Sequence, residues 1–323
     1  MKTGKISEPI LKRSVLKKIS YKSKSVLSRA AVGHDSAVVA VGEKRMVTAT
    51  ETVVAKVNLL QCRPFIKAVN NLAAVGATPQ YAQISIVLPE GMREIKLKMI
   101  MDEMADYAAK SQVHITGGST SVSDAVINPV VTVTVTGFMD NDSDCKYKYK
   151  EEIKPGYDIV MTKAAALEGT AILAMEHQEE FEKRFTSLYI NNASAFINDI
   201  SIVNEAAVAI KHGVAAMHDM SEGGVFGAIW ELCEAGNCGA EINLKKINMR
   251  QETIELTNYL NINPYLMPSA GSLLMVTKDG LGLINEMEKN GIDAYVIGKI
   301  TEGNDRVVVN DEEKRFLEPP KNK

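Results

Sequence analysis

The chain has 323 residues, of which 46% are hydrophobic and 24% charged, and its formal net charge is -3 at pH 7. This length exceeds a single core of about 100–200 residues and predicts two domains. The charge lacks the basic excess of a nucleic-acid-binding protein, and no apolar run approaches the ~20 residues that cross a bilayer. We expect a cytoplasmic protein without a nucleic-acid or membrane partner.

The first half of the chain alternates between strand and helix patterns. In chain order we predict a hairpin of strands over 37–41 and 46–50, a helix that Pro64 opens and Gly76 stops, a strand over 81–88, a helix with an apolar stripe from Leu97 to Ala108, and a strand over 131–136. Between the last two, residues 113–116 predict a strand that passes into a loop at Gly117–Thr120.

A polar, highly charged stretch over 140–152 predicts the domain boundary. We therefore expect an N-terminal domain over 1–145 and a C-terminal domain over 153–323. The second half continues with predicted strands over 158–161, 214–217, 272–277 and 294–297, and with predicted helices over 168–174, from Phe196 to Gly213, after Gly224 and over 282–289. Alternating strands and helices in both halves predict an α/β (or α+β) fold.

The stretch HDMSEGGVFGAIW, over 218–230, places ionisable side chains directly before two glycines that open a predicted helix. A strand that leads through glycines into a helix presents free backbone N–H groups at the positive end of that helix, which suits a phosphate. His218, Asp219 and Glu222 cluster at this open end. The same residues are also explained by helix capping and by an ordinary hydrogen-bonded histidine, so the stretch alone leaves both interpretations open.

Several segments together resemble the AIR synthase (PurM) superfamily, which includes thiamine monophosphate kinase and the hydrogenase-maturation protein HypE. The similar segments, in chain order, are Gly33-His-Asp-Ser-Ala37, Thr50-Glu-Thr-Val-Val-Ala-Lys56, Asn70-Asn-Leu-Ala-Ala-Val-Gly-Ala-Thr-Pro79, Gly117-Gly-Ser-Thr120, Glu168-Gly-Thr-Ala-Ile-Leu-Ala174 and His218-Asp-Met-Ser-Glu-Gly-Gly224. The fifth segment and the domain order are most similar to the HypE branch.

The resemblance implies a two-domain AIR synthase-like fold whose N-terminal sheet forms a homodimer interface, with ATP and Mg²⁺ bound in the cleft. It implies an ATP-dependent enzyme that activates an unidentified small-molecule or protein acceptor by phosphorylation, related to hydrogenase maturation. The residues that it assigns are Asp35 and Glu51 for the metal, Lys56, Asn71, Gly117, Gly118, Ser119, Thr120, Gly223 and Gly224 for the nucleotide, and His218, Asp219 and Glu222 for catalysis, with His218 as a proton shuttle near neutral pH.

Two positions depart from the family pattern, because Asn71 and Ser119 stand where the family has acids. Neutral oxygens bind Mg²⁺ more weakly than carboxylates do. The departures favour one alternative to the enzyme, a nucleotide-binding or scaffold paralogue that has lost phosphoryl transfer. A second alternative, a small-metabolite kinase similar to thiamine monophosphate kinase, rests on the similarity of Gly33-His-Asp-Ser-Ala37 to the family's Gly-x-Asp-x-Ala segment.

Overall fold

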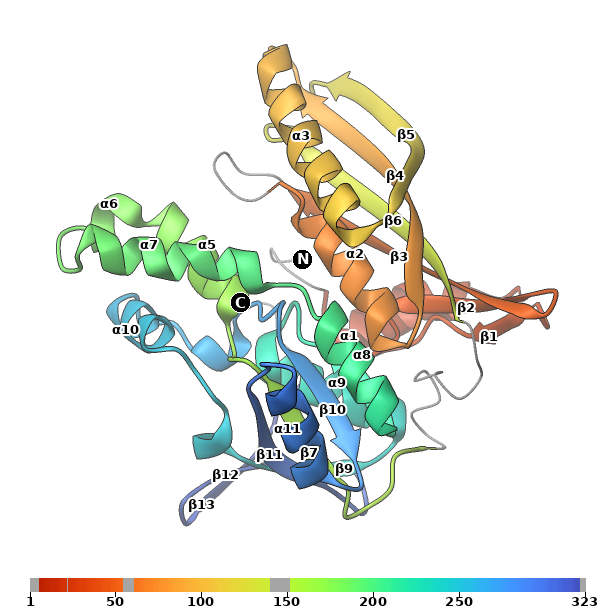
Figure 1. The fold of residues 1–323 in the computed structure, drawn as a ribbon, viewed down its shortest axis with the longest axis vertical. Coiled ribbons are helices and arrows are strands. Elements are labelled where there is room, and N and C mark those ends of the chain that lie inside the picture. The colour runs from red at the N-terminus through yellow and green to blue at the C-terminus, as the bar shows by residue number, and fades with distance from the viewer. Residues whose placement is uncertain (1–5, 22, 55–60, 140–151, 320–323) are drawn as a thin grey trace.

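A computed structural model of the protein describes residues 6–21, 23–54, 61–139 and 152–319. Two sheets divide the described residues, and each has helices packed on it (Figure 1). The first sheet has the strand order β1-β2-β3-β6-β4-β5. Its elements, with the helices of this half, are α1 (Glu8–Ile10), β1 (Val26–Ser28), β2 (Ser36–Val41), β3 (Lys44–Val54), α2 (Arg63–Ala74), β4 (Thr78–Pro89), α3 (Glu94–Ser111), β5 (His114–Ser123) and β6 (Val130–Met139).

The second sheet has the order β13-β12-β9-β11-β7-β10-β8. The elements of this half are β7 (Asp158–Thr162), α5 (Leu167–Glu176), α6 (Gln178–Phe181), α7 (Ser187–Ala195), η4 (Phe196–Asp199), α8 (Val203–His212), β8 (Ala216–Asp219), α9 (Gly224–Gly236), β9 (Gly239–Asn243), η5 (Leu244–Lys246), α10 (Gln251–Tyr259), η6 (Pro264–Leu266), β10 (Leu273–Thr277), α11 (Gly280–Lys289), β11 (Ala294–Thr301), β12 (Arg306–Asn310) and β13 (Glu313–Phe316). The α/β class predicted from the alternating pattern is confirmed.

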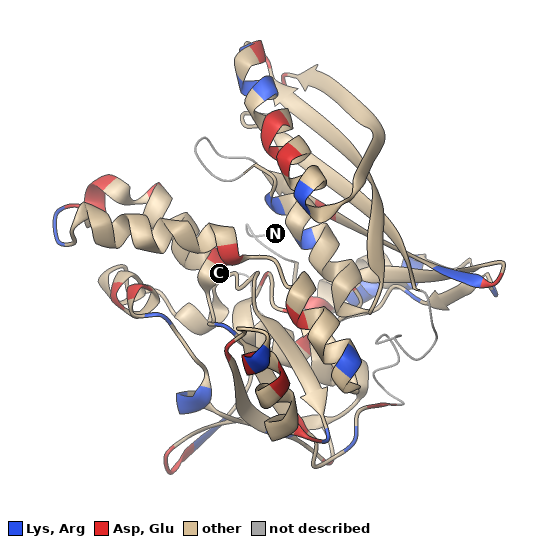
Figure 2. Cartoon of the chain, in the orientation of Figure 1, with Lys and Arg blue, Asp and Glu red and all other residues tan. Residues whose placement is uncertain are grey.

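The first sheet has an apolar face and a hydroxyl-rich face, as the period-two pattern of β6 predicts. Val131, Val133 and Val135 are fully buried beneath the helices. On the opposite face, threonines of β3 and β6 pair across the strands, with Thr50 bonded to Thr134 at 2.9 Å. Basic and acidic residues are interspersed along the exposed side of α3 (Figure 2).

The predicted loop at Gly117–Thr120 is wrong, because β5 continues through these residues to Ser123. A bulge at Thr116 precedes them, and its hydroxyl donates to the Ala82 carbonyl oxygen at 3.0 Å. Gly118 then approaches β4 so closely that a Cβ atom would lie 1.7 Å from the Ile84 carbonyl oxygen. Gly118 therefore allows close strand pairing rather than a turn.

Helix α2 connects the two halves. All twelve of its residues are buried. Its apolar side chains join the core of the first half, whereas Ala73 and Ala74 belong to a core built with α8, β8 and β10 of the second half. The polar residues of α2 must therefore find partners inside the protein.

The single helix predicted from Phe196 to Gly213 is interrupted. The turn η4 ends at Asp199 and α8 begins at Val203. The side chain of Asn70, on α2, bonds both sides of the break: it donates to the Ile200 carbonyl oxygen at 2.8 Å and accepts from the Ile202 backbone N–H at 3.1 Å. Periodicity could not reveal this interruption, because a residue 130 positions away stabilises it.

No single helix of the described ranges is long and apolar enough to cross a membrane; by length and composition only, the bent pair Ser187–Asp199 and Val203–His212 passes the same test together.

We predict that Asn70→Ala lowers the free energy of unfolding by about 2–4 kcal/mol, because it leaves a buried carbonyl oxygen and a buried N–H without partners. Denaturant unfolding measures this change. The matched control is Asn290→Ala, which removes an exposed bond to the Glu286 carbonyl oxygen and is expected to change stability by less than about 0.5 kcal/mol. Equal effects of the two substitutions would contradict the bridging role of Asn70.

Candidate functional site

A hollow of about 290 Å³, counting its open mouth, lies where the two halves meet. It is bordered by the segment before β2, by the end of α2 and by β8. The lining residues are Ser28, Gly33, His34, Asp35, Ser36, Asn71, Ala74, Val75, His218 and Asp219. The hollow thus combines residues that are far apart in the sequence. Five of its ten lining residues come from one short segment, residues 28–36.

A polar stripe runs along the buried helix α2. Its members, Arg63, Lys67 and Asn71, are spaced four residues apart and so share one face. Each bonds a carboxylate that another element supplies: Arg63 pairs with Glu168 at 3.5 Å, Lys67 with Glu222 at 3.2 Å, and Asn71 donates to Glu51 at 2.8 Å. Two of these carboxylates belong to the second half, so the stripe connects the halves by charge.

Lys67 is the more deeply buried of the two positive charges in this stripe. Only 3% of its side chain is exposed. Burial lowers the pKa of its ammonium group, but Glu168, Glu222 and Glu51 raise that pKa by more, so that it lies above its ordinary value. Lys67 is therefore permanently charged, and our sequence analysis missed it. The available signal was a lysine four residues before Asn71 in a helix that is mostly apolar.

Glu51 lies on β3 and faces α2. Burial raises the pKa of its carboxyl group to about 7; the charges of Asp219 and Asp35 raise it further, while Lys67 and the bond from Asn71 lower it. Asn71 presents its amide nitrogen to Glu51 rather than its oxygen. At neutral pH this carboxyl group is consequently about half ionised.

His218 and Asp219 end the edge strand β8 and are both buried. His218 Nδ1 lies 3.7 Å from an Asp219 oxygen, and its Nε2 lies 3.6 Å from an oxygen of Glu231 on α9. Burial lowers the pKa of the imidazole, but these two carboxylates raise it by more, to about 10. The expected proton-shuttle role of His218 stays a prediction.

The structure brings five of the predicted site residues together: Asp35, Glu51, Asn71, His218 and Asp219. Glu222 joins them through Lys67. Lys56 lies outside the described residues. The segment Gly117–Thr120 lies on β5, which β6 and β4 separate from β3. At the usual strand spacing it is about 14 Å from Glu51, and its role in nucleotide binding stays a prediction.

The glycine pair that opens α9 has a packing role. Gly223 is the N-cap residue with φ 90°, and Gly224 has φ 66°. A Cβ atom on Gly224 would lie 2.5 Å from the Tyr265 carbonyl oxygen. Gly224 is therefore needed for close packing against the backbone near Tyr265. The assignment of Gly223 and Gly224 to nucleotide binding stays a prediction.

The chain matches two family descriptions over most of its length. Residues 33–139 match "AIR synthase related protein, N-terminal domain", and residues 154–310 match "AIR synthase related protein, C-terminal domain". A hydrogenase expression/formation protein of Methanocaldococcus jannaschii is 24% identical over 95% of this chain and 91% of its own length. Carbamoyl dehydratase HypE of Bradyrhizobium diazoefficiens is 24% identical over 64% of this chain and 58% of its own length.

Solved structures share the fold. HypE in a HypE-HypF complex superimposes with a TM-score of 0.78 at 16% identity, over 95% of this chain and 100% of that one. HypE in complex with ATP has a TM-score of 0.70 at 15% identity, over 99% and 96%. ThiL complexed with AMPPCP and TMP has a TM-score of 0.72 at 17% identity, over 96% of each chain. The expected two-domain AIR synthase-like fold is thereby confirmed.

We predict that Glu51→Gln stabilises the protein at pH 8 by about 3 kcal/mol and changes little at pH 5. The folded state binds this proton more tightly than the unfolded state does, so the wild-type stability falls as the pH rises from the ordinary value of 4.5 to about 7. Glutamine keeps the bond from Asn71 without the buried charge. Denaturant unfolding at both pH values measures the effect, with exposed Glu43→Gln as the control. A gain that is the same at both pH values would contradict the assignment.

Proposed function

We propose, starting from the fact that this chain belongs to the AIR synthase related protein family, that it binds ATP at the hollow between its halves and transfers the γ-phosphoryl group to an acceptor oxygen. The observation that carries the proposal is the convergence of Asp35, Glu51 and Asp219 beside the buried ammonium group of Lys67. ATP and AMPPCP occur in solved structures with the same fold, which supports a nucleotide in this protein.

The hollow suits the phosphate end of a nucleotide. Its volume of about 290 Å³ includes open solvent at its mouth, so the enclosed space is too small for a whole nucleotide and admits only one end of it. Its carboxylates repel phosphate unless cations compensate them. Lys67 supplies one fixed positive charge, which we assign to the triphosphate together with the amide of Asn71.

Magnesium fits the donor set. Asp35 and Glu51 would hold the ion, and both offer the carboxylate oxygens that it prefers. One Asp219 oxygen is buried without a hydrogen-bond partner among the described residues. The raised pKa of Glu51 also reflects unrelieved negative charge, which a dication would offset. When bound, the ion would neutralise negative charge that develops on the phosphates during transfer.

The proposed step breaks the bond between the γ-phosphorus and its bridging oxygen. The acceptor oxygen forms the new bond to phosphorus, and ADP leaves with the bond's electron pair. Asp219 and Glu222 orient the acceptor, and Asp219 takes its proton through the unpartnered carboxylate oxygen. Lys67 stays protonated throughout and stabilises the negative charge at the phosphates.

We place this activity in hydrogenase maturation, in the cytoplasm. The relatives named above as a hydrogenase expression/formation protein and as HypE support this assignment, and the HypE-HypF complex supports a protein partner or protein acceptor. The chain spans less than two thirds of the HypE relative, so the substrate of that enzyme is not carried over.

We further propose a homodimer through the threonine-rich face of the first sheet. Thr50 and Thr52 are exposed there and bond only across their own sheet in the contacts described, to Thr134 at 2.9 Å and Thr132 at 3.0 Å. Hydroxyl rows of this kind can pair with the same rows of a second copy. Light scattering is expected to give twice the mass of one chain; the mass of a single chain would contradict the dimer.

One observation favours the alternative of a nucleotide-binding scaffold without phosphoryl transfer. Asn71 and Ser119 replace family acids, and Asn71 directs its N–H group, not an oxygen, to Glu51. Calorimetry with ATP combined with a phosphate-release assay over a panel of acceptors separates the two. Binding with turnover supports the enzyme, and binding without turnover supports the scaffold. Turnover with a small phosphorylated acceptor would support the second alternative, a kinase similar to thiamine monophosphate kinase.

We predict that Lys67→Met weakens ATP binding at least tenfold, because it removes the fixed positive charge and leaves three carboxylates facing the phosphates. Isothermal titration calorimetry with Mg²⁺ present measures the affinity. Exposed Lys211→Met is the matched control. Exposed Asp35→Asn provides a second test that does not disturb the buried helix. Unchanged affinity in both Lys67→Met and Asp35→Asn would overturn the proposed nucleotide site.

A further inference from the structure

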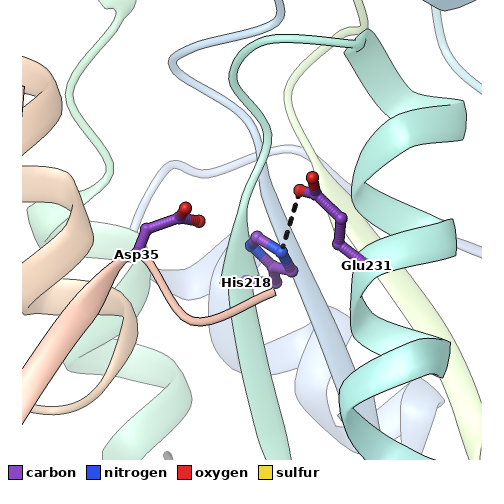
Figure 3. A group of neighbouring side chains, drawn as sticks. All are labelled: Asp35, His218 and Glu231. Atoms are coloured by element: carbon purple, nitrogen blue, oxygen red, sulfur yellow. Dashed lines mark ion pairs between the residues drawn. The ribbon is translucent and has the colours of Figure 1, made fainter. Parts of the chain in front are cut away.

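Three potential metal ligands from three separate elements meet beside the hollow, which two of them line. Asp35 lies in the segment before β2, His218 on β8 and Glu231 on α9. In Figure 3 the Asp35 carboxylate points toward the imidazole ring from one side, and Glu231 faces the ring from the other. One ligand atom from each residue lies within 4.8 Å of the other two.

We propose that Asp35, His218 and Glu231 form a binding site for a divalent first-row transition-metal ion. Ligands at about 2.0–2.2 Å from one ion lie roughly 3–4 Å from each other. The three atoms therefore need only small side-chain rotations to reach a common ion. Because Asp35 belongs to the first half and the other two residues to the second, a bound ion would connect the two halves.

An unsatisfied nitrogen inside the cluster is the second observation that points to a ligand. His218 is 3% exposed, and its Nε2 atom has no hydrogen-bond partner among the described residues. The Glu231 oxygen lies 3.6 Å away, beyond a good hydrogen bond. A buried polar atom left in this state costs free energy that an ion coordinated between the two atoms would recover.

Asp219 lies beside the other ring nitrogen of His218. Its carboxylate lies 3.7 Å from His218 Nδ1. At this distance the contact is electrostatic rather than a good hydrogen bond. A carboxylate beside one ring nitrogen, with the other nitrogen available to a metal, is the usual arrangement around metal-binding histidines.

The donor set selects the class of metal. Imidazole nitrogen favours Zn²⁺, Fe²⁺ and Co²⁺ over Mg²⁺, and two carboxylates are compatible with all of them. Three protein ligands leave positions open toward the hollow, which Asp35 and His218 also line. The site is thus distinct in chemistry from the all-oxygen magnesium site proposed for the nucleotide. It shares Asp35 with that site but requires neither ATP nor phosphoryl transfer.

Cobalt titration of the untagged full chain in mildly alkaline buffer, without nucleotide, tests the proposal. Trp230 is the one tryptophan of the sequence and is adjacent to Glu231, so bound Co²⁺ should quench its fluorescence. We expect one equivalent of Co²⁺, visible d–d absorption without thiolate charge-transfer bands, displacement by Zn²⁺, and no displacement by excess Mg²⁺.

Two ligand variants and one control complete the test. Glu231→Gln and Asp35→Asn are expected to weaken Co²⁺ binding at least tenfold while keeping the wild-type circular dichroism spectrum, and exposed Asp102→Asn is expected to bind as the wild type does. No saturable binding to the wild type, unchanged affinity in both ligand variants, or thiolate bands would overturn the site. Because no ATP is present, failure here is distinguishable from failure of the proposed phosphoryl transfer.

Discussion

The burial of α2 on all sides is the constraint on which the rest of the structure depends. This helix packs into the core of the first half and, at Ala73 and Ala74, into a core of the second. A buried helix can carry charged side chains only where other elements supply oppositely charged partners, because an unpaired buried charge costs several kcal/mol. Arg63 and Lys67 have such partners in Glu168 and Glu222. The same requirement that joins the halves therefore concentrates charge at the junction between them.

This concentration of charge also explains the unusual state of the site. Glu51 and His218 both have raised pKa values, Glu51 chiefly through burial and His218 through carboxylates that outweigh its burial. In both cases a bound cation would supply positive charge to offset the buried carboxylates. The Asp219 oxygen and His218 Nε2 are buried polar atoms without hydrogen-bond partners in the described part of the chain. Buried polar atoms without hydrogen-bond partners are typical of sites that bind ions or ligands, because binding supplies the missing partner.

The sequence predicted much of this fold because its signals are local. The β2–β3 hairpin, α2, α3 and β7 follow from apolar spacing and from the placement of glycine and proline. The misses arise from long-range contacts: β5 continues through its glycines because β4 is close, and Asn70 breaks the helix before α8. For the same reason, motifs identified Asp35 and His218, whereas Lys67 and Glu231 gained significance only when folding placed carboxylates and an imidazole beside them.

A crystal structure of the protein with a non-hydrolysable ATP analogue and Mn²⁺ tests the central claim most directly. The account predicts the terminal phosphate between α2 and β8, within contact of Lys67 Nζ, with anomalous scattering from manganese beside Asp35. An analogue bound elsewhere, such as the separate hollow lined by Met249, Asn258 and Tyr265, with Lys67 still enclosed by its carboxylates, would contradict it.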